Sequence, residues 1–314
     1  MELDRIYCAS SNAMRDVDDN SVQLIVTSPP YNVGKDYNYY ADHRPLDEYL
    51  DMLMGVWKEC QRVLVPGGRI AVNVANTNRN PYLPLHAFII RQFLDLKFLM
   101  RGEILWDKSV SAGVSTAWGS FGRSSNPVLR DTHEYIMVFS KETMRLDKPY
   151  THGDYSGIEN MEFVAWTKSI WHGDDTAQAS VREIENSIWH FATQSKKIKH
   201  LYKEIEHPAP FPLDLPLRLT LLYTNVDDIV LDPFMGTGST AIAAKLTQRH
   251  YLGYDISPDY IEIAEARIQL YTQQPFIPEF APRQLKPPEK KSKTVPFRAR
   301  VSSNGNSRRA KKDG

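Results

Sequence analysis

Four consecutive residues, Ser28-Pro29-Pro30-Tyr31, are the part of the sequence best suited to chemistry. They follow the apolar run at residues 22–26, which predicts a strand that ends at this corner. Neither proline has a backbone N–H, and each fixes its own φ angle and restricts the residue before it. The corner therefore holds the Ser28 side chain, the Pro29 carbonyl and the Tyr31 ring in one fixed relation. These groups suit the acceptance of hydrogen bonds from an exocyclic amine while an aromatic face stacks on the ring that carries the amine.

A glycine-rich turn, Asp232-Pro233-Phe234-Met235-Gly236-Thr237-Gly238, is the second chemical feature. It stands between a predicted strand at 228–232 and a predicted helix at 239–246, which is the context of a nucleotide-binding turn. Glycine permits a tight turn and lets the backbone approach a ligand closely. Asp255 ends the next predicted strand, where a carboxylate can accept both hydroxyls of a ribose. Together these residues predict a cofactor that contains adenosine.

Two cofactors compete for this turn. NAD would place its pyrophosphate at the start of helix 239–246, and Gly236-x-Gly238-x-x-Ala241 fits that pattern loosely. S-adenosyl-L-methionine has no phosphate and needs groups for a sulfonium and an amino-acid head. Asp232 could draw the ammonium and Phe234 could pack on the adenine or the sulfonium, although both could also belong to a simple strand-ending turn. The corner at Ser28 favours S-adenosyl-L-methionine, because no hydride chemistry requires such a corner.

Strands and helices alternate along most of the chain. Helices are predicted at 46–64, 83–98, 239–246 and from Ser257-Pro258 onward, and further strands at 69–74, 102–106, 133–139 and 251–255. Residues 32–44 and the Ser- and Gly-rich residues 109–127 predict loops. Residues 145–204 break the alternation, so we expect an inserted module with Trp166, Trp171 and Trp189 in its own small core. Alternation on both sides of an insert implies an α/β fold with a doubly wound, largely parallel sheet.

The composition, 42% hydrophobic and 24% charged, is that of an ordinary globular protein. No apolar run approaches the roughly 18 residues of a membrane span, and residues 1–5 lack the apolar segment of a secretory signal. Two cysteines, Cys8 and Cys60, make neither a disulfide framework nor a metal cluster, so we expect no metal and a reducing cytoplasm. Residues 281–314 contain eleven Lys or Arg against two acids and predict a disordered basic tail. The tail either attracts phosphates or only aids solubility.

The two chemical features together resemble the DNA amino-methyltransferases, which modify cytosine N4 or adenine N6. The catalytic motif of that family, Asp/Asn/Ser-Pro-Pro-Tyr/Phe, is matched by Ser28-Pro29-Pro30-Tyr31, and its Phe-x-Gly-x-Gly cofactor motif by residues 234–238. A His/Lys-Pro segment before the cofactor strand is similar to residues 207–212. The catalytic motif comes first, then the insert, then the cofactor motif. This order resembles the circularly permuted beta subgroup, and the resemblance covers about residues 5–272.

The resemblance implies the fold of S-adenosylmethionine-dependent methyltransferases, divided into four parts. The catalytic half would span 1–144, a target-recognition insert 145–204, the cofactor half 205–275 and the basic tail 276–314. The implied catalytic residues are Ser28, Pro29, Pro30 and Tyr31. The implied cofactor residues are Pro212, Asp232, Phe234, Gly236, Gly238, Thr240 and Asp255.

The first motif residue bears on the target base. Asp is usual there in adenine enzymes and Ser is typical of N4-cytosine enzymes, so Ser28 implies cytosine N4 and leaves adenine N6 as the alternative. The target base would flip out of the duplex, stack on Tyr31 and donate hydrogen bonds to Ser28 and the Pro29 carbonyl. That contact would orient the nitrogen lone pair for in-line methyl transfer. Methylation at cytosine C5 needs a reactive thiolate, usually in a Pro-Cys context that neither cysteine has.

The residues that would contact DNA are less sharply marked. Lys196, Lys197 and Lys199 could bind phosphates, and Arg123 and Arg130 could reach phosphates or guanine edges, although all five could also be solvated surface charges. Asn32 and Tyr37 could line the target pocket or only order their loop. The resemblance implies double-stranded DNA as the substrate and a place at a prokaryotic or phage nucleoid in the cytoplasm. It allows a cognate restriction endonuclease and a homodimer as partners and leaves both open.

Other functions stay open at this point. An NAD-dependent oxidoreductase would use Gly236, Gly238 and Asp255 but leaves the Ser28 corner unexplained. A DNA-binding module without activity would leave two intact motifs unexplained. Methylation of RNA or protein on the same fold is also open, although the large insert favours DNA.

Overall fold

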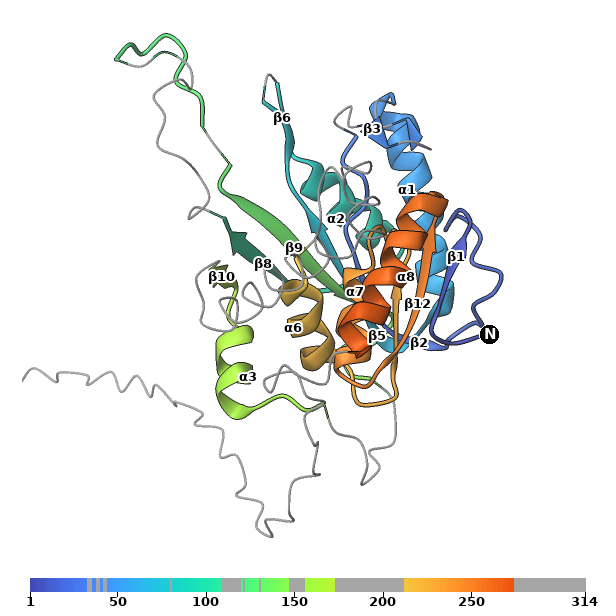
Figure 1. The fold of residues 1–314 in the computed structure, drawn as a ribbon. Coiled ribbons are helices and arrows are strands. Elements are labelled where there is room, and N and C mark those ends of the chain that lie inside the picture. The colour runs from blue at the N-terminus through green and yellow to red at the C-terminus, as the bar shows by residue number, and fades with distance from the viewer. Residues whose placement is uncertain are drawn as a thin grey trace, which may run out of the picture.

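An eight-stranded sheet organises the part of the chain that the computed structural model describes, which is residues 1–32, 36–37, 40–41, 44–79, 81–108, 120, 122–129, 131–146, 156–172 and 212–273. The strand order is β1 (Arg5–Cys8), β12 (His250–Asp255), β11 (Ile229–Asp232), β2 (Val22–Thr27), β5 (Leu64–Val74), β9 (His133–Ser140), β8 (Leu99–Asp107) and β10 (Ile170–His172). Neighbouring strands are parallel except at β9, which is antiparallel to both β5 and β8. The predicted largely parallel α/β sheet is confirmed (Figure 1).

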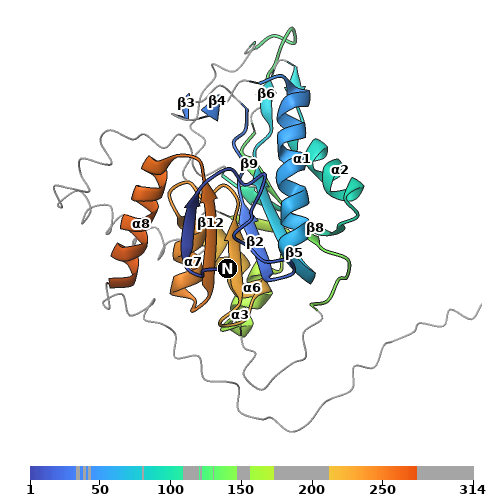
Figure 2. The ribbon, with the colours of Figure 1, turned by 90° about the vertical axis from the view of Figure 1, so that its right-hand side faces the viewer.

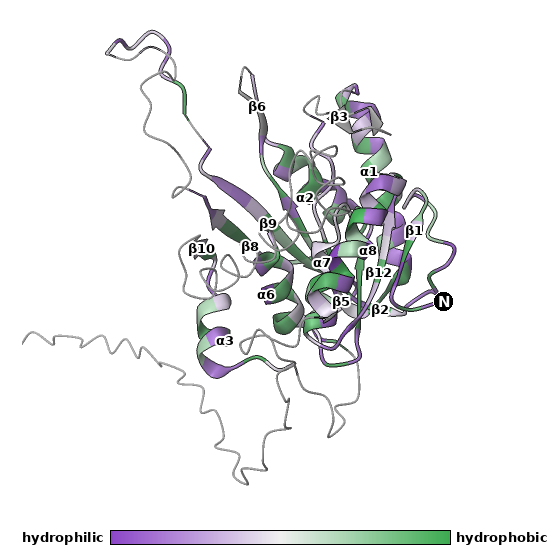
Figure 3. Ribbon diagram, in the orientation of Figure 1, coloured by the Kyte–Doolittle hydropathy of each residue, from purple (hydrophilic) through white to green (hydrophobic). Residues whose placement is uncertain are grey.

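Helices cover both faces of this sheet (Figure 2). One face carries α6 (Asp214–Tyr223), α7 (Ser239–Leu246) and α8 (Pro258–Gln273), and the other carries α1 (Leu46–Val63) and α2 (Leu85–Asp95). The helices of each face pack against the sheet, and a separate apolar core lies between the helices and the sheet on each side. Figure 3 shows hydrophobic and hydrophilic residues alternating along α6, and the residues Asp214–Leu221 of this helix are all buried. Two short ribbons, β3 (Asp36–Tyr37) with β4 (Tyr40–Ala41) and β6 (Thr77–Arg79) with β7 (Tyr82–Leu83), lie outside the main sheet.

The predicted helix start at Ser257-Pro258 is confirmed. Ser257 accepts a hydrogen bond from the Tyr260 amide at 3.3 Å through its hydroxyl, and Pro258 is the first helical residue. A serine cap followed by proline suits a helix start because the first amides have no partner within the helix. One face of α8 is buried and is made by Tyr260, Ala264, Ile268 and Tyr271.

The α6 helix was missed by the sequence analysis. Its residues follow a proline-rich segment and include Pro216, which usually argues against a helix. Leu213 caps the helix, so Pro216 lies in the first turn, where no backbone N–H is needed for the helical ladder. The proline is therefore compatible with the helix. Three further elements, β1, β10 and α3 (Asn160–Trp166), were also not predicted from the sequence.

Residues 156–172 are joined to the main body, contrary to the expectation that the inserted module has its own small core. β10 adds to the sheet beside β8, and α3 packs on α6. Trp166 and Trp171 are buried in the principal core, and the Arg218 guanidinium lies 5.6 Å and 5.3 Å from their rings. These tryptophans therefore close the edge of the sheet, and Trp189 lies outside the described residues. The boundary of the insert at 145–204 stays a prediction.

Gly67 explains why β5 begins earlier than expected. The sequence predicts a helix at 46–64 and a strand at 69–74, whereas α1 ends at Val63 and β5 already begins at Leu64. Gly67 has a φ of 75°, and its amide donates to the Lys141 carbonyl at 2.8 Å. A Cβ added at Gly67 would lie 2.0 Å from the Arg145 carbonyl oxygen. The strand therefore passes this point only without a side chain.

The Gly67→Ala variant is expected to lose at least about 2 kcal/mol of unfolding free energy, from left-handed strain and a clash with backbone. Urea unfolding followed by circular dichroism measures the loss. Gly102→Ala is the matched control, because nothing lies within 4 Å of its added Cβ. Equal stability of the two variants would contradict the strain at Gly67.

The parallel strands direct the polar loops to one edge. The carboxyl ends of β1, β12, β11, β2 and β5 point the same way, because these strands are parallel neighbours. Ligands of open α/β sheets bind at this edge. Among the described residues, no helix is both long enough and apolar enough to cross a membrane.

Candidate active site

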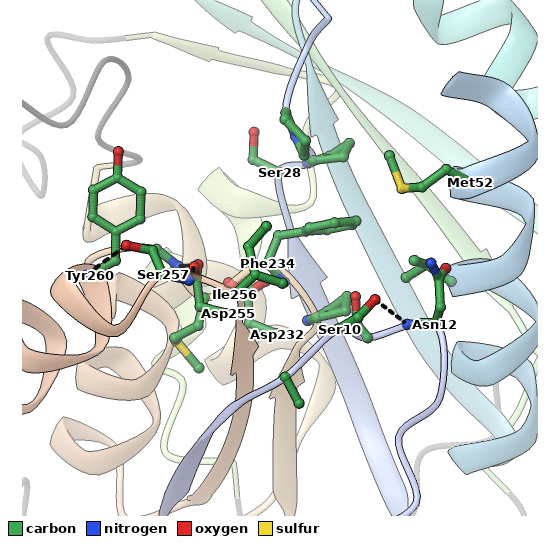
Figure 4. A pocket seen from close by; sticks show the side chains of 18 of the residues that line it. Ser10, Asn12, Ser28, Met52, Asp232, Phe234, Asp255, Ile256, Ser257 and Tyr260 are labelled. Carbon is green, nitrogen blue, oxygen red and sulfur yellow. Dashed lines mark hydrogen bonds between the residues drawn. The ribbon is translucent and has the colours of Figure 1, made fainter. Parts of the chain in front are cut away.

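A cavity of about 380 Å³ lies at the carboxyl edge of the sheet. Figure 4 shows Ser28, Phe234 and Asp255 around the same space, although they come from three different strand ends. The two motifs that the sequence analysis singled out therefore share one cavity. Its lining comprises Ala9–Asn12, Ser28–Tyr31, Arg44, Met52, Val56, Asp232–Thr237, Ser239, Asp255–Ser257 and Tyr260.

Asp232 is the buried acid of the cavity. Its Oδ1 accepts hydrogen bonds from the Thr27 hydroxyl at 2.7 Å and from the Phe234 amide at 3.0 Å, and its Oδ2 accepts from the Thr240 hydroxyl at 2.7 Å. Burial raises the pKa of Asp232 to about 6, although these hydrogen bonds favour the charged form. The carboxylate is thus fixed in position and accessible from the cavity, where a cationic group would compensate its charge.

Asp255 holds the glycine-rich turn in place. Its carboxylate accepts hydrogen bonds from the amides of Gly236 at 2.8 Å and Ser257 at 2.9 Å. Burial raises its pKa. An ionised carboxylate oxygen has more than one lone pair, so each oxygen retains capacity for a ligand hydroxyl.

Gly238 and Thr240 do not line the cavity, although the sequence analysis named both as cofactor residues. Gly238 has a φ of 85°, and an added Cβ would lie 2.8 Å from the Ala264 Cβ. This glycine lets α7 and α8 approach each other. Thr240 acts behind the cavity, through its hydrogen bond to Asp232.

Hydrogen bonds from α1 and within the motif itself hold the corner at residues 28–31. The Tyr49 hydroxyl, on the buried face of α1, donates to the Pro30 carbonyl at 2.7 Å. The Ser28 and Tyr31 hydroxyl oxygens are 3.0 Å apart. Burial, and secondarily the charge of Glu134, raises the pKa of Tyr31 well above its usual range. The Tyr31 phenol therefore keeps its proton at neutral pH.

The remaining sequence-predicted residues lie apart from the cavity lining or outside the described residues. Pro212 is described just before α6, away from the lining, and Arg123 is exposed. Asn32 orders its loop, since it exchanges two hydrogen bonds of 2.8 Å with the Arg44 backbone. Lys196, Lys197, Lys199 and Arg130 lie outside the described residues, and nothing is described of the Tyr37 side chain.

Several lining residues were not anticipated. Ala9, Ser10, Ser11 and Asn12 follow β1, which is parallel to β12 and brings them beside Asp255. Small polar residues directly after a short apolar segment were the only available signal. Met52 and Val56 come from α1, where the helical pattern explains them as ordinary packing residues.

The cavity has the groups that S-adenosyl-L-methionine requires. Asp232 and Asp255 supply two carboxylates to its lining and Phe234 supplies an aromatic side chain, groups that suit an ammonium, hydroxyls and an apolar ring respectively. Fold and site together define an S-adenosylmethionine-dependent methyltransferase.

Comparison with known proteins identifies the family. Residues 22–266 match the DNA methylase family of N6 and N4 methyltransferases. The type II methyltransferase M.BglII of Bacillus subtilis is 30% identical over 83% of this chain and 68% of its own. The DNA adenine methyltransferase YhdJ of Escherichia coli is 25% identical over 82% and 79%. The putative DNA modification methylase TTHA0409 of Thermus thermophilus, solved with S-adenosyl-L-methionine, is 27% identical over 86% of this chain and 96% of that one, with a TM-score of 0.62.

The chain belongs to the N6/N4 DNA methylase family. It is a DNA methyltransferase, and its cofactor is S-adenosyl-L-methionine.

Proposed function

We propose that this enzyme methylates the exocyclic N4 of cytosine in duplex DNA. The observation that carries the proposal is Ser28, a neutral hydroxyl in place of a carboxylate, at the cavity wall beside the Tyr31 ring. A flipped base stacked on Tyr31 would place its amine against Ser28 and the Pro29 carbonyl. Stacking of a base on an aromatic ring contributes about 1–3 kcal/mol, which offsets part of the cost of flipping.

The residues of the chain contribute positioning and electrostatics. Asp232, Phe234 and Asp255 would hold the cofactor, and the corner at Ser28 would orient the amine. S-adenosyl-L-methionine supplies a methyl group on a sulfonium, and transfer forms the N–C bond while the C–S electron pair stays on sulfur. The nitrogen then loses one proton to solvent.

Identification of the methylated nucleoside tests the proposal. Purified protein and methyl-labelled S-adenosyl-L-methionine are incubated with genomic DNA from a host that lacks DNA methyltransferases, and the digested nucleosides are analysed by mass spectrometry. N4-methylcytosine is the expected product. N6-methyladenine would reject the base assignment and keep the family, and the relative YhdJ is named an adenine methyltransferase. Absence of any methylated nucleoside would reject duplex DNA as the substrate.

The biological setting follows from the relatives. Several of them are named type II methyltransferases, so we propose that the enzyme protects DNA from a cognate restriction endonuclease in a prokaryotic or phage context. The basic cluster at Lys196, Lys197 and Lys199, together with Arg123 and Arg130, is proposed to bind the DNA.

Replacement of both cysteines is expected to leave methyl transfer within about twofold of the wild type. Cys60 is fully buried in α1, and burial raises the pKa of its thiol well above the usual range, so no thiolate forms there. Cys8 is exposed, and neither residue lines the cavity. The Cys8→Ser/Cys60→Ala variant is assayed for transfer and for unfolding temperature. Loss of transfer with an unchanged unfolding temperature would indicate a covalent route.

A further inference from the structure

The Tyr31 hydroxyl is the centre of a polar cluster behind the catalytic corner. Its oxygen lies 3.0 Å from the Ser28 Oγ, 3.3 Å from the Glu134 Oε2 and 3.3 Å from the Asn73 Nδ2. Asn73 lies in β5 and Glu134 in β9, two antiparallel neighbours in the sheet. The cluster is therefore held by two hydrogen-bonded neighbouring strands of the sheet.

Glu134 is anchored at both carboxylate oxygens. The Asn73 amide donates to its Oε2 at 2.7 Å, and the Lys108 ammonium forms an ion pair with its Oε1. Both Glu134 and Asn73 are buried, with 9% and 2% of their surfaces exposed. Glu134 does not line the cavity, so it acts on a ligand only through Tyr31 and Ser28.

The chemical types of these groups give the hydrogen bonds a direction. A carboxylate only accepts and an amide nitrogen only donates, whereas a hydroxyl can do either. The Tyr31 proton is therefore directed to Glu134, which leaves the Tyr31 oxygen as an acceptor. The Ser28 hydroxyl then donates its proton to Tyr31 and turns its lone pairs toward the cavity.

We propose that Glu134 is a positioning residue that makes the Ser28 oxygen an acceptor for the amine of the target base. Such a positioning residue is needed only when the motif begins with serine. A serine hydroxyl that is not held can point its proton at the amine, whereas an ionised carboxylate at this position has no proton to misdirect. The proposal rests on the proposed function only in placing the target amine at Ser28. It applies to N4 of cytosine and N6 of adenine alike.

Single-turnover methyl transfer tests the proposal in three variants: Glu134→Leu, Tyr31→Phe and the double variant. Each single change interrupts the series of hydrogen bonds from Glu134 through Tyr31 to Ser28. Each is expected to slow methyl transfer by about 10²-fold. The affinities for S-adenosyl-L-methionine and for the same genomic DNA should stay within about twofold. The double variant should be no slower than the slower single variant, because both changes remove one function. Fully multiplicative losses would overturn the proposal, and so would an undiminished rate in Tyr31→Phe.

Tyr254→Phe is the matched control. The Tyr254 hydroxyl also donates to a carboxylate, Asp16, at 3.4 Å, but it lies away from the cavity lining. Its removal should leave the rate unchanged. A comparable loss of rate in this variant would overturn the assignment of a special role to Tyr31.

A spectroscopic signature provides a readout that does not depend on turnover. In cofactor-free protein with ¹³Cζ-labelled tyrosine, the Tyr31 signal is assigned from its absence in Tyr31→Phe. It should shift in Glu134→Leu and stay in place in Tyr254→Phe. An unshifted signal in folded Glu134→Leu would overturn the proposal. If the wild type makes N6-methyladenine, the cytosine assignment fails, while the same variants still test Glu134 on that product.

Discussion

Replacement of Ser28 with alanine is expected to slow methyl transfer at saturating substrates by at least about 10²-fold, because it removes a preorganised acceptor at the reacting amine. The affinity for S-adenosyl-L-methionine should stay within about twofold, since the groups proposed to hold the cofactor are Asp232, Phe234 and Asp255, and Ser28 is not one of them. Single-turnover transfer of a labelled methyl group and calorimetric titration of the cofactor measure the two quantities.

Ser21→Ala is the control for the loss of a serine hydroxyl. The Ser21 hydroxyl donates to the Asp18 carbonyl on an exposed loop, at the opposite end of β2 from the corner. Its rate should match the wild type. An equal loss of rate and of cofactor affinity in Ser28→Ala would mean that Ser28 supports the cavity as a whole and has no special relation to the amine.

Replacement of Asp232 with asparagine is expected to weaken cofactor binding by about 30-fold or more. Removal of one partner of a buried, hydrogen-bonded charge pair typically costs about 2–5 kcal/mol. Asparagine keeps an acceptor for Thr27 and the Phe234 amide, and the Thr240 hydroxyl can reverse its role, so the local geometry should survive. Calorimetric titration at pH 7.5 measures the affinity, and unchanged binding would show that Asp232 does not meet the ammonium.

The same variant should make the cofactor-free protein more stable. Because burial raises the pKa of Asp232 to about 6 from 3.8, the folded state binds the extra proton between these values. The charged form then destabilises the folded protein above pH 6, by up to about 3 kcal/mol. The stability gained in Asp232→Asn should be full above pH 6 and should shrink as the pH falls toward 4. Thermal unfolding of both proteins at pH 5 and 7.5 measures the difference, and a gain that grows toward acid would contradict the raised pKa.

Local signals explain why some elements could be predicted from the sequence. In α7, α8 and the strands before them, the apolar periodicity, the helix-capping residues and the turn glycines lie within a few residues of one another. The helix at 46–64 was found by its apolar spacing, although its end was placed one residue late. In contrast, β1 and β10 are short strands whose pairing with β12 and β8 depends on residues far away in the sequence.

Site residues could be predicted from the sequence where they lie within short, recognisable motifs. The corner at Ser28, together with Asp232, Phe234 and Asp255, was found because each stands beside proline, glycine or a strand end, and the cavity brings all four together. Glu134 and Asn73 gave no such signal, since each is a single polar residue within a strand. Their relation to Tyr31 arises from the register of β5 and β9, which only the folded sheet defines.

The pairing of β1 with β12 affects when the cavity can form during synthesis of the protein. Residues 9–12 and 255–257 line the same cavity, yet a ribosome makes them at nearly opposite ends of the described fold. The corner at Ser28 is synthesised early, whereas the residues proposed to hold the cofactor are made only with β11 and β12. On the proposed site, a nascent or truncated chain that stops before residue 255 lacks part of the cavity lining and is expected to have no methyl transfer activity.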